Sequence, residues 1–151
     1  MRSGYVSIRT GDALAGRGGD IDVIVGAGNS GAGGDIFIFA GEAQAANQQG
    51  GHVQIAGGLG SSATSGVAGG SGGDVSVNGG QAMGSLTTDY GGTITLNGGS
   101  AAGGAGGSIY LSSGYSATFN SGDIMLSTFD ATAGVSGQFM VQTGNSASGN
   151  R

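Results

Sequence analysis

The residues of this chain that could do chemistry are few, and most of them are carboxylates. The 151 residues include nine acidic residues, four arginines, one histidine and no cysteine. Asp20 and Asp22 lie two residues apart, and Asp35 follows one repeat later, after a second glycine pair. Carboxylate oxygens are the ligands that Ca²⁺ prefers. The sequence predicts no metal site overall, and if any ion binds, Asp20, Asp22 and Asp35 are where it would do so.

Catalytic groups are equally sparse. His52 is the one histidine, so a histidine-based metal site or a Ser-His-Asp relay cannot be built within one chain. Glycan-cleaving enzymes need two carboxylates placed across a scissile bond, whereas the acids here are spread along the repeats, with His52 falling between Asp35 and Asp74. We therefore expect no enzymatic activity and no cofactor.

Charge and hydropathy exclude two further classes of partner. The formal net charge is −5 and there is no lysine, and the arginines Arg2, Arg9, Arg17 and Arg151 are scattered, which excludes nucleic-acid binding. No apolar run approaches the roughly 20 residues that a membrane-spanning helix needs. We therefore expect neither nucleic-acid binding nor insertion into a membrane.

The chain is organised as a tandem repeat built around glycine, which accounts for 38 residues. One unit is represented by Gly33-Gly34-Asp35-Ile36-Phe37-Ile38-Phe39-Ala40-Gly41, in which Gly34 is termed the repeat glycine. The nine repeat glycines, at a base period of 15, are Gly4, Gly19, Gly34, Gly51, Gly73, Gly92, Gly107, Gly122 and Gly137. A fixed period of this kind is typical of repeat proteins.

Two apolar positions recur in every unit. The residues two after each repeat glycine, termed the plus-two row, are Val6, Ile21, Ile36, Val53, Val75, Ile94, Ile109, Ile124 and Phe139. Those four after it, the plus-four row, are Ile8, Val23, Ile38, Ile55, Val77, Leu96, Leu111, Leu126 and Val141. Apolar residues separated by one position mark one face of a strand, because side chains alternate across the pleat.

The remaining half begins with a glycine in every unit except one, where Phe129 stands instead, and is rich in Ala, Ser and Gly. This composition favours a second strand with small inward side chains. Two strands and two turns in 15 residues predict an all-β fold, a parallel β-solenoid of about nine coils. The alternative is an antiparallel meander with long loops. We expect residues 1–151 to form one repeat domain, a fragment of a longer fibre protein that continues upstream of Met1.

Three insertions interrupt the base period, near Gln48-Gln49, in Gly60 to Ser71, and around Ser85 to Thr88. All three fall in the small-residue half of the unit, so we expect them to form loops at one edge. They are either tolerated surface loops or part of a binding face.

The opposite strand face is mainly polar but has two apolar groups. The first comprises Ile24, Phe37 and Phe39, and the second Tyr110, Met125 and Met140. On stacked coils each group would form one patch, which predicts binding or subunit contact at these six residues. We expect a homo-oligomer, with a trimer favoured. The alternative is that these side chains bind sugar rings or pack under the inserted loops.

The Gly-Gly-Asp-Ile-x-Val and Gly-Gly-Ser-Ile-x-Leu strands and the tract Gly-Asn-Ser-Gly-Ala-Gly resemble Gly/Ser/Ala-rich repeats in surface proteins of microalgae, stramenopiles and large algal viruses. In architecture the predicted fold is similar to the β-roll heads of trimeric bacterial adhesins, although the adhesin head motif is missing. Both resemblances imply a fibre on a cell surface or virion. The function they imply is structural and non-enzymatic, with attachment to a host cell wall polysaccharide or glycan.

Two other functions are weighed against this one. Thr93, Thr95, Asn78 and Asn97 lie on adjacent units, and flat threonine arrays bind ice in several antifreeze families. Here the threonines occupy a single strand, so no regular lattice is predicted. A glycan-cleaving β-helix enzyme is the least favoured alternative.

Overall fold

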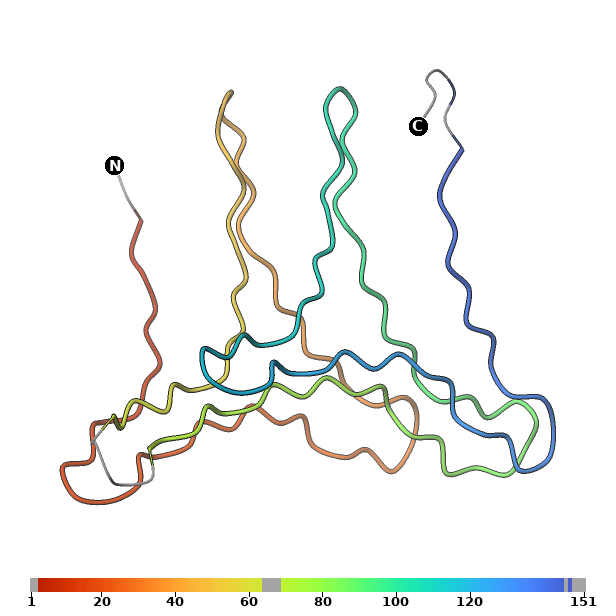
Figure 1. Cartoon of the computed structure of the whole chain (residues 1–151), viewed down its shortest axis with the longest axis horizontal. Coiled ribbons are helices and arrows are strands. Elements are labelled where there is room, and N and C mark those ends of the chain that lie inside the picture. Colours follow the sequence, from red (N-terminus) through yellow and green to blue (C-terminus); the bar gives the residue numbers. More distant parts are fainter. Residues whose placement is uncertain (1–2, 64–68, 146, 148–151) are drawn as a thin grey trace. The chain divides into compact units, whose positions relative to one another are not determined.

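The computed structural model describes residues 3–63, 69–145 and 147 of the chain. None of these described residues belongs to a helix or a strand, and Figure 1 draws the chain as a continuous tube. The predicted parallel β-solenoid is therefore wrong, since no sheet is present in the described part. By their internal contacts the residues divide into two units, Met1–Val77 and Asn78–Arg151.

The chain bends in the small-residue half of its units. Bends lie at residues 14–16, 29–31, 102–104, 117–119 and 132–134, and turns lie at 46–47 and 87–88, each preceded by a bend. Gly16, Gly31 and Gly134 have φ values of 138°, 83° and 142°, which glycine adopts readily because it lacks a Cβ. This half of the unit therefore reverses the chain, and the prediction that it forms a second strand is wrong.

The two ends of a bend meet through glycine. In five places the N–H of a repeat glycine donates to the carbonyl of the glycine that precedes the bend, an arrangement we term a closure. The five donor–acceptor pairs are Gly51–Gly41 at 2.8 Å, Gly73–Gly58 at 2.9 Å, Gly92–Gly80 at 2.8 Å, Gly107–Gly99 at 2.8 Å and Gly122–Gly114 at 3.0 Å. The loops between them differ in length, so the closure tolerates insertions.

Close approach of the two backbones explains why glycine recurs at the closures. A Cβ added to Gly57, Gly79 or Gly98 would collide with the carbonyl of the repeat glycine that follows, respectively Gly73, Gly92 and Gly107. Elsewhere a side chain occupies this space. A Cβ added to Gly19 would lie 3.2 Å from Thr10 Cγ2, and one added to Gly137 would lie 3.4 Å from Thr128 Cγ2.

The contact partners of the repeat glycines show why no solenoid forms. In stacked coils Gly34 would lie over Gly19, whereas here a Cβ on Gly34 would lie 2.7 Å from Val25 Cγ1, just before the bend. Gly51 likewise lies against Ala40 and Gly41. This is the connectivity of successive hairpins, as in the antiparallel alternative, although no described residue belongs to a strand.

Two of the three insertions fall within closed loops of the described part. Gln48-Gln49 falls within the loop closed by Gly41 and Gly51, and Ser85 to Thr88 falls within the loop closed by Gly80 and Gly92. The longest insertion lies between Gly58 and Gly73, and its residues 64–68 are outside the described part.

The apolar rows are uncovered. No described hydrophobic side chain is buried. The plus-two row is the less exposed of the two, with Ile94 at 49% and Ile124 at 53%, while Leu96 and Leu126 in the plus-four row reach 70% and 66%. The apolar residues of both rows are therefore exposed to solvent rather than packed in a core.

Candidate functional site

Phe37 and Phe39 form a pair of stacked aromatic rings on the extended half of one unit. Residues two apart in an extended backbone point to the same side, so the alternation of this stretch brings the rings together. Their centroids are 6.0 Å apart and their planes differ by 14°. Phe37 is 73% exposed and Phe39 is 84% exposed. This aromatic pair therefore offers two nearly parallel, apolar and accessible rings.

Stacked coils would place Ile24 beside Phe37 and Phe39. It is exposed and lies on the preceding unit, before the bend at residues 29–31. Without coils there is no ladder to align it with the rings. The structure therefore brings together the rings of Phe37 and Phe39. The argument that placed Ile24 beside them depended on the solenoid and no longer applies.

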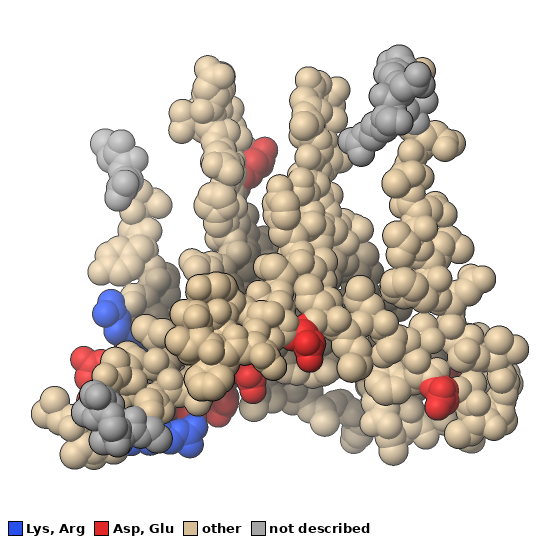
Figure 2. Space-filling view, in the orientation of Figure 1, with Lys and Arg blue, Asp and Glu red and all other residues tan. Residues whose placement is uncertain are grey.

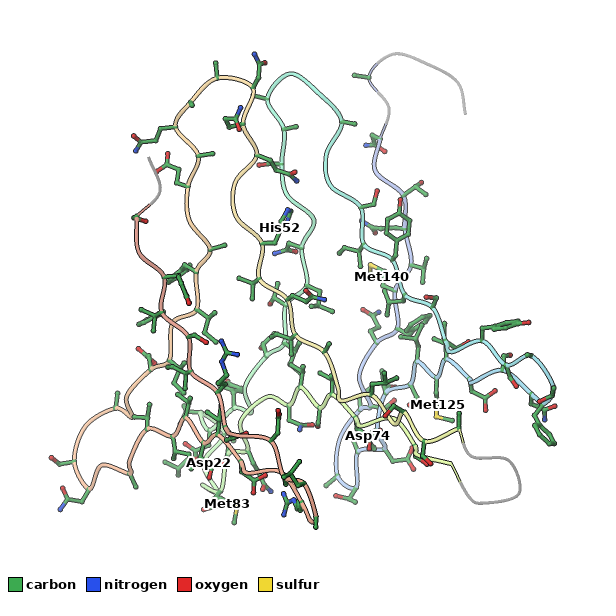
Figure 3. All side chains as sticks on the ribbon, turned by 90° about the vertical axis from the view of Figure 1, so that its left-hand side faces the viewer. Asp22, His52, Asp74, Met83, Met125 and Met140 are labelled. Carbon is green, nitrogen blue, oxygen red and sulfur yellow. The ribbon has the colours of Figure 1, made fainter. Side chains whose placement is uncertain are left out.

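The two methionines of the second apolar group lie apart. Tyr110, Met125 and Met140 are all exposed. Figure 3 labels both methionines and shows them on separate stretches of the chain rather than side by side. Their predicted proximity depended on the solenoid ladder, in which they would occupy equivalent positions on consecutive coils.

The acidic residues do not converge. Asp20 Oδ1 accepts a hydrogen bond from Arg17 Nη2 at 2.7 Å, in an exposed ion pair of a kind that contributes less than about 1 kcal/mol. In the described part of the chain, no group of three His, Cys, Asp or Glu residues could hold a metal ion. Asp20, Asp22 and Asp35 are therefore not brought together as stacked coils would bring them.

The remaining polar residues are also dispersed. Figure 3 places His52 and Asp74 on separate stretches of the chain. On the face drawn in Figure 2 the surface is mostly uncharged, with scattered acidic groups and basic groups at its lower left.

Sequence reasoning missed a side-chain-capped turn in the third insertion. The N–H of Asp89 donates to the carbonyl of Leu86 at 3.0 Å, and the N–H of Leu86 donates to Asp89 Oδ2 at 2.9 Å. A Cβ on Gly84 would collide with the Asp89 carboxylate, so a side chain at this position would displace that carboxylate. The available signal was an aspartate three residues after the start of a polar loop, since Asp side chains hydrogen-bond to nearby backbone in turns.

No helix among the described residues is long and apolar enough to cross a membrane. Comparisons with protein-family models, with curated proteins and with solved structures found no match.

Proposed function

We propose that this chain is a non-enzymatic structural and attachment segment of a surface fibre, which associates with copies of itself and contacts glycan. The observation that carries the proposal is the repeated exposure of the plus-two and plus-four rows. Two apolar side chains recur in all nine units, yet no described hydrophobic residue is buried. Apolar surface on this scale favours association, at about 25 cal/mol per Å² removed from water.

A second copy is the partner that best fits these rows. They recur at a base period of 15 residues, and another copy of the chain carries apolar rows at the same period. The low content of charged residues, 9%, leaves little like-charge repulsion between copies. Closed symmetry, which most homo-oligomers have, would cover the apolar rows of every copy, and we retain three copies as the proposed number.

The aromatic pair supports the attachment role. The C–H faces of a sugar ring pack against aromatic rings, and Phe37 and Phe39 offer two nearly parallel, exposed rings. Asp35 lies two residues before Phe37, on the same side of an extended backbone. Its carboxylate can accept hydrogen bonds from sugar hydroxyls while the rings contact the apolar face.

This role places the chain on an extracellular surface or a virion, where a cell wall polysaccharide is accessible. Catalysis is not part of the proposal, because the carboxylates are dispersed over the repeats rather than paired across a cleft. Ice binding lacks a specific supporting observation, since Thr93 and Thr95 lie in a segment without a sheet to flatten them into an array.

Binding to immobilised neutral cell wall polysaccharides tests the attachment role. We expect the natural chain to bind, and Phe37→Ala with Phe39→Ala to reduce its affinity by about tenfold or more, since stacking on an aromatic ring is worth about 1 kcal/mol each. Phe129→Ala is the matched control, because Phe129 is 93% exposed and is not part of the ring stack. Equal loss in both variants, or no binding by the natural chain, would contradict the proposal.

A further inference from the structure

Two asparagine–glycine dipeptides occupy the same place in consecutive units. In each dipeptide the asparagine lies five residues after a repeat glycine: Asn78 after Gly73, and Asn97 after Gly92. Both asparagines are exposed and belong to neither a helix nor a strand. The other described asparagines are followed by bulkier residues, namely serine after Asn29, Asn120 and Asn145, and glutamine after Asn47.

This dipeptide is chemically unstable in an exposed, irregular backbone. The glycine backbone nitrogen loses its proton and attacks Cγ of the asparagine, forming a five-membered succinimide, and the side-chain nitrogen leaves as ammonia. Water then opens the ring at either carbonyl and yields aspartate or isoaspartate. Glycine favours the attack because no Cβ hinders the approach of its nitrogen and its backbone is flexible. A helix or strand would hold the attacking nitrogen away from Cγ, and neither is present here.

Both glycines also lie at closures. A Cβ on Gly79 would collide with the Gly92 carbonyl, and one on Gly98 with the Gly107 carbonyl. The following glycines accept the closure hydrogen bonds, Gly80 from Gly92 at 2.8 Å and Gly99 from Gly107 at 2.8 Å. Isoaspartate adds a methylene group to the main chain directly before these contacts, and it also adds a carboxylate.

We propose that Asn78-Gly79 and Asn97-Gly98 are sites of spontaneous succinimide-mediated modification, and that isoaspartate formation opens the two closures that follow them. The inference is independent of the proposed function. Both sites of backbone modification lie in the unit Asn78–Arg151.

Peptide mass spectrometry of the full chain after prolonged incubation at neutral pH tests the chemistry. We expect nearly complete loss of the amide at Asn78 and Asn97, with isoaspartate and aspartate both present, while Asn29 and Asn120 keep most of theirs. Equal rates at all four asparagines would overturn the proposal. Aspartate without isoaspartate would also overturn it, because direct hydrolysis does not pass through the succinimide.

Amide hydrogen exchange tests the structural consequence in the same aged sample. Protection of the Gly92 and Gly107 N–H groups should be lost, whereas protection of Gly51 should persist, because Ala40 and Gly41 precede that closure. A chain with Asn78→Gln and Asn97→Gln, aged in parallel, should keep protection at all three glycines. Unchanged protection at Gly92 and Gly107 despite isoaspartate formation would contradict the proposed opening.

Discussion

Gly79 and Gly92 approach so closely that a single added carbon on Gly79 would collide with the carbonyl of Gly92. The next glycine along, Gly80, accepts the hydrogen bond from the Gly92 N–H at 2.8 Å, yet a Cβ on Gly80 would meet nothing within 4 Å. Adjacent glycines at one closure therefore have opposite steric requirements.

Gly79→Ala should open the closure and Gly80→Ala should leave it intact. Loss of the Gly92–Gly80 hydrogen bond is worth about 1 kcal/mol, so exchange of the Gly92 amide hydrogen should accelerate roughly fivefold in Gly79→Ala. The pair Gly98→Ala and Gly99→Ala repeats the comparison at Gly107, because Gly99 also has nothing within 4 Å. Similar exchange in both members of a pair would show that these close contacts do not determine the closure.

The turn at Leu86 to Asp89 depends on one carboxylate. Asp89→Ala removes the acceptor for the Leu86 N–H, which costs about 1 kcal/mol, and should accelerate exchange of the Leu86 amide hydrogen. Asp89→Asn keeps an oxygen at the same position and should retain most of the protection. If Asp89→Asn exchanged as fast as Asp89→Ala, the side chain would not be the capping group.

Charge in the plus-two row should prevent association without altering the single chain. Ile94 is 49% exposed, so Ile94→Asp buries no charge in the monomer, but in an assembly it removes an apolar contact worth about 2 kcal/mol and introduces a carboxylate. Thr95→Asp is the matched control, since its side chain points to the opposite side of an extended backbone. Sedimentation velocity should show loss of the larger species for Ile94→Asp alone. The face assignment fails if the two variants behave alike.

The sequence predicts the local pattern of this chain better than its long-range pairing. The alternation of Phe37 and Phe39 with Ile36 and Ile38 correctly indicates that the two rings share a side, because that follows from an extended backbone alone. The insertion at Gln48-Gln49 falls in a loop as predicted, since the small-residue half of the unit tolerates added length.

The solenoid prediction failed because an alternating apolar pattern identifies a face but not its partner. The solenoid prediction stacks each repeat glycine on that of the preceding unit, Gly34 on Gly19, whereas Gly34 lies against Val25, which precedes the bend between them. Glycine permits both geometries, so its presence cannot distinguish them. The predicted grouping of Met125 with Met140 assumed stacked coils, and the two methionines lie apart.

Sedimentation equilibrium of the natural chain at micromolar concentration tests the central claim, that the exposed apolar rows are covered by other copies. The account predicts a defined species larger than the 14.2 kDa monomer, with three copies favoured. A single species at 14.2 kDa throughout the concentration range would contradict it.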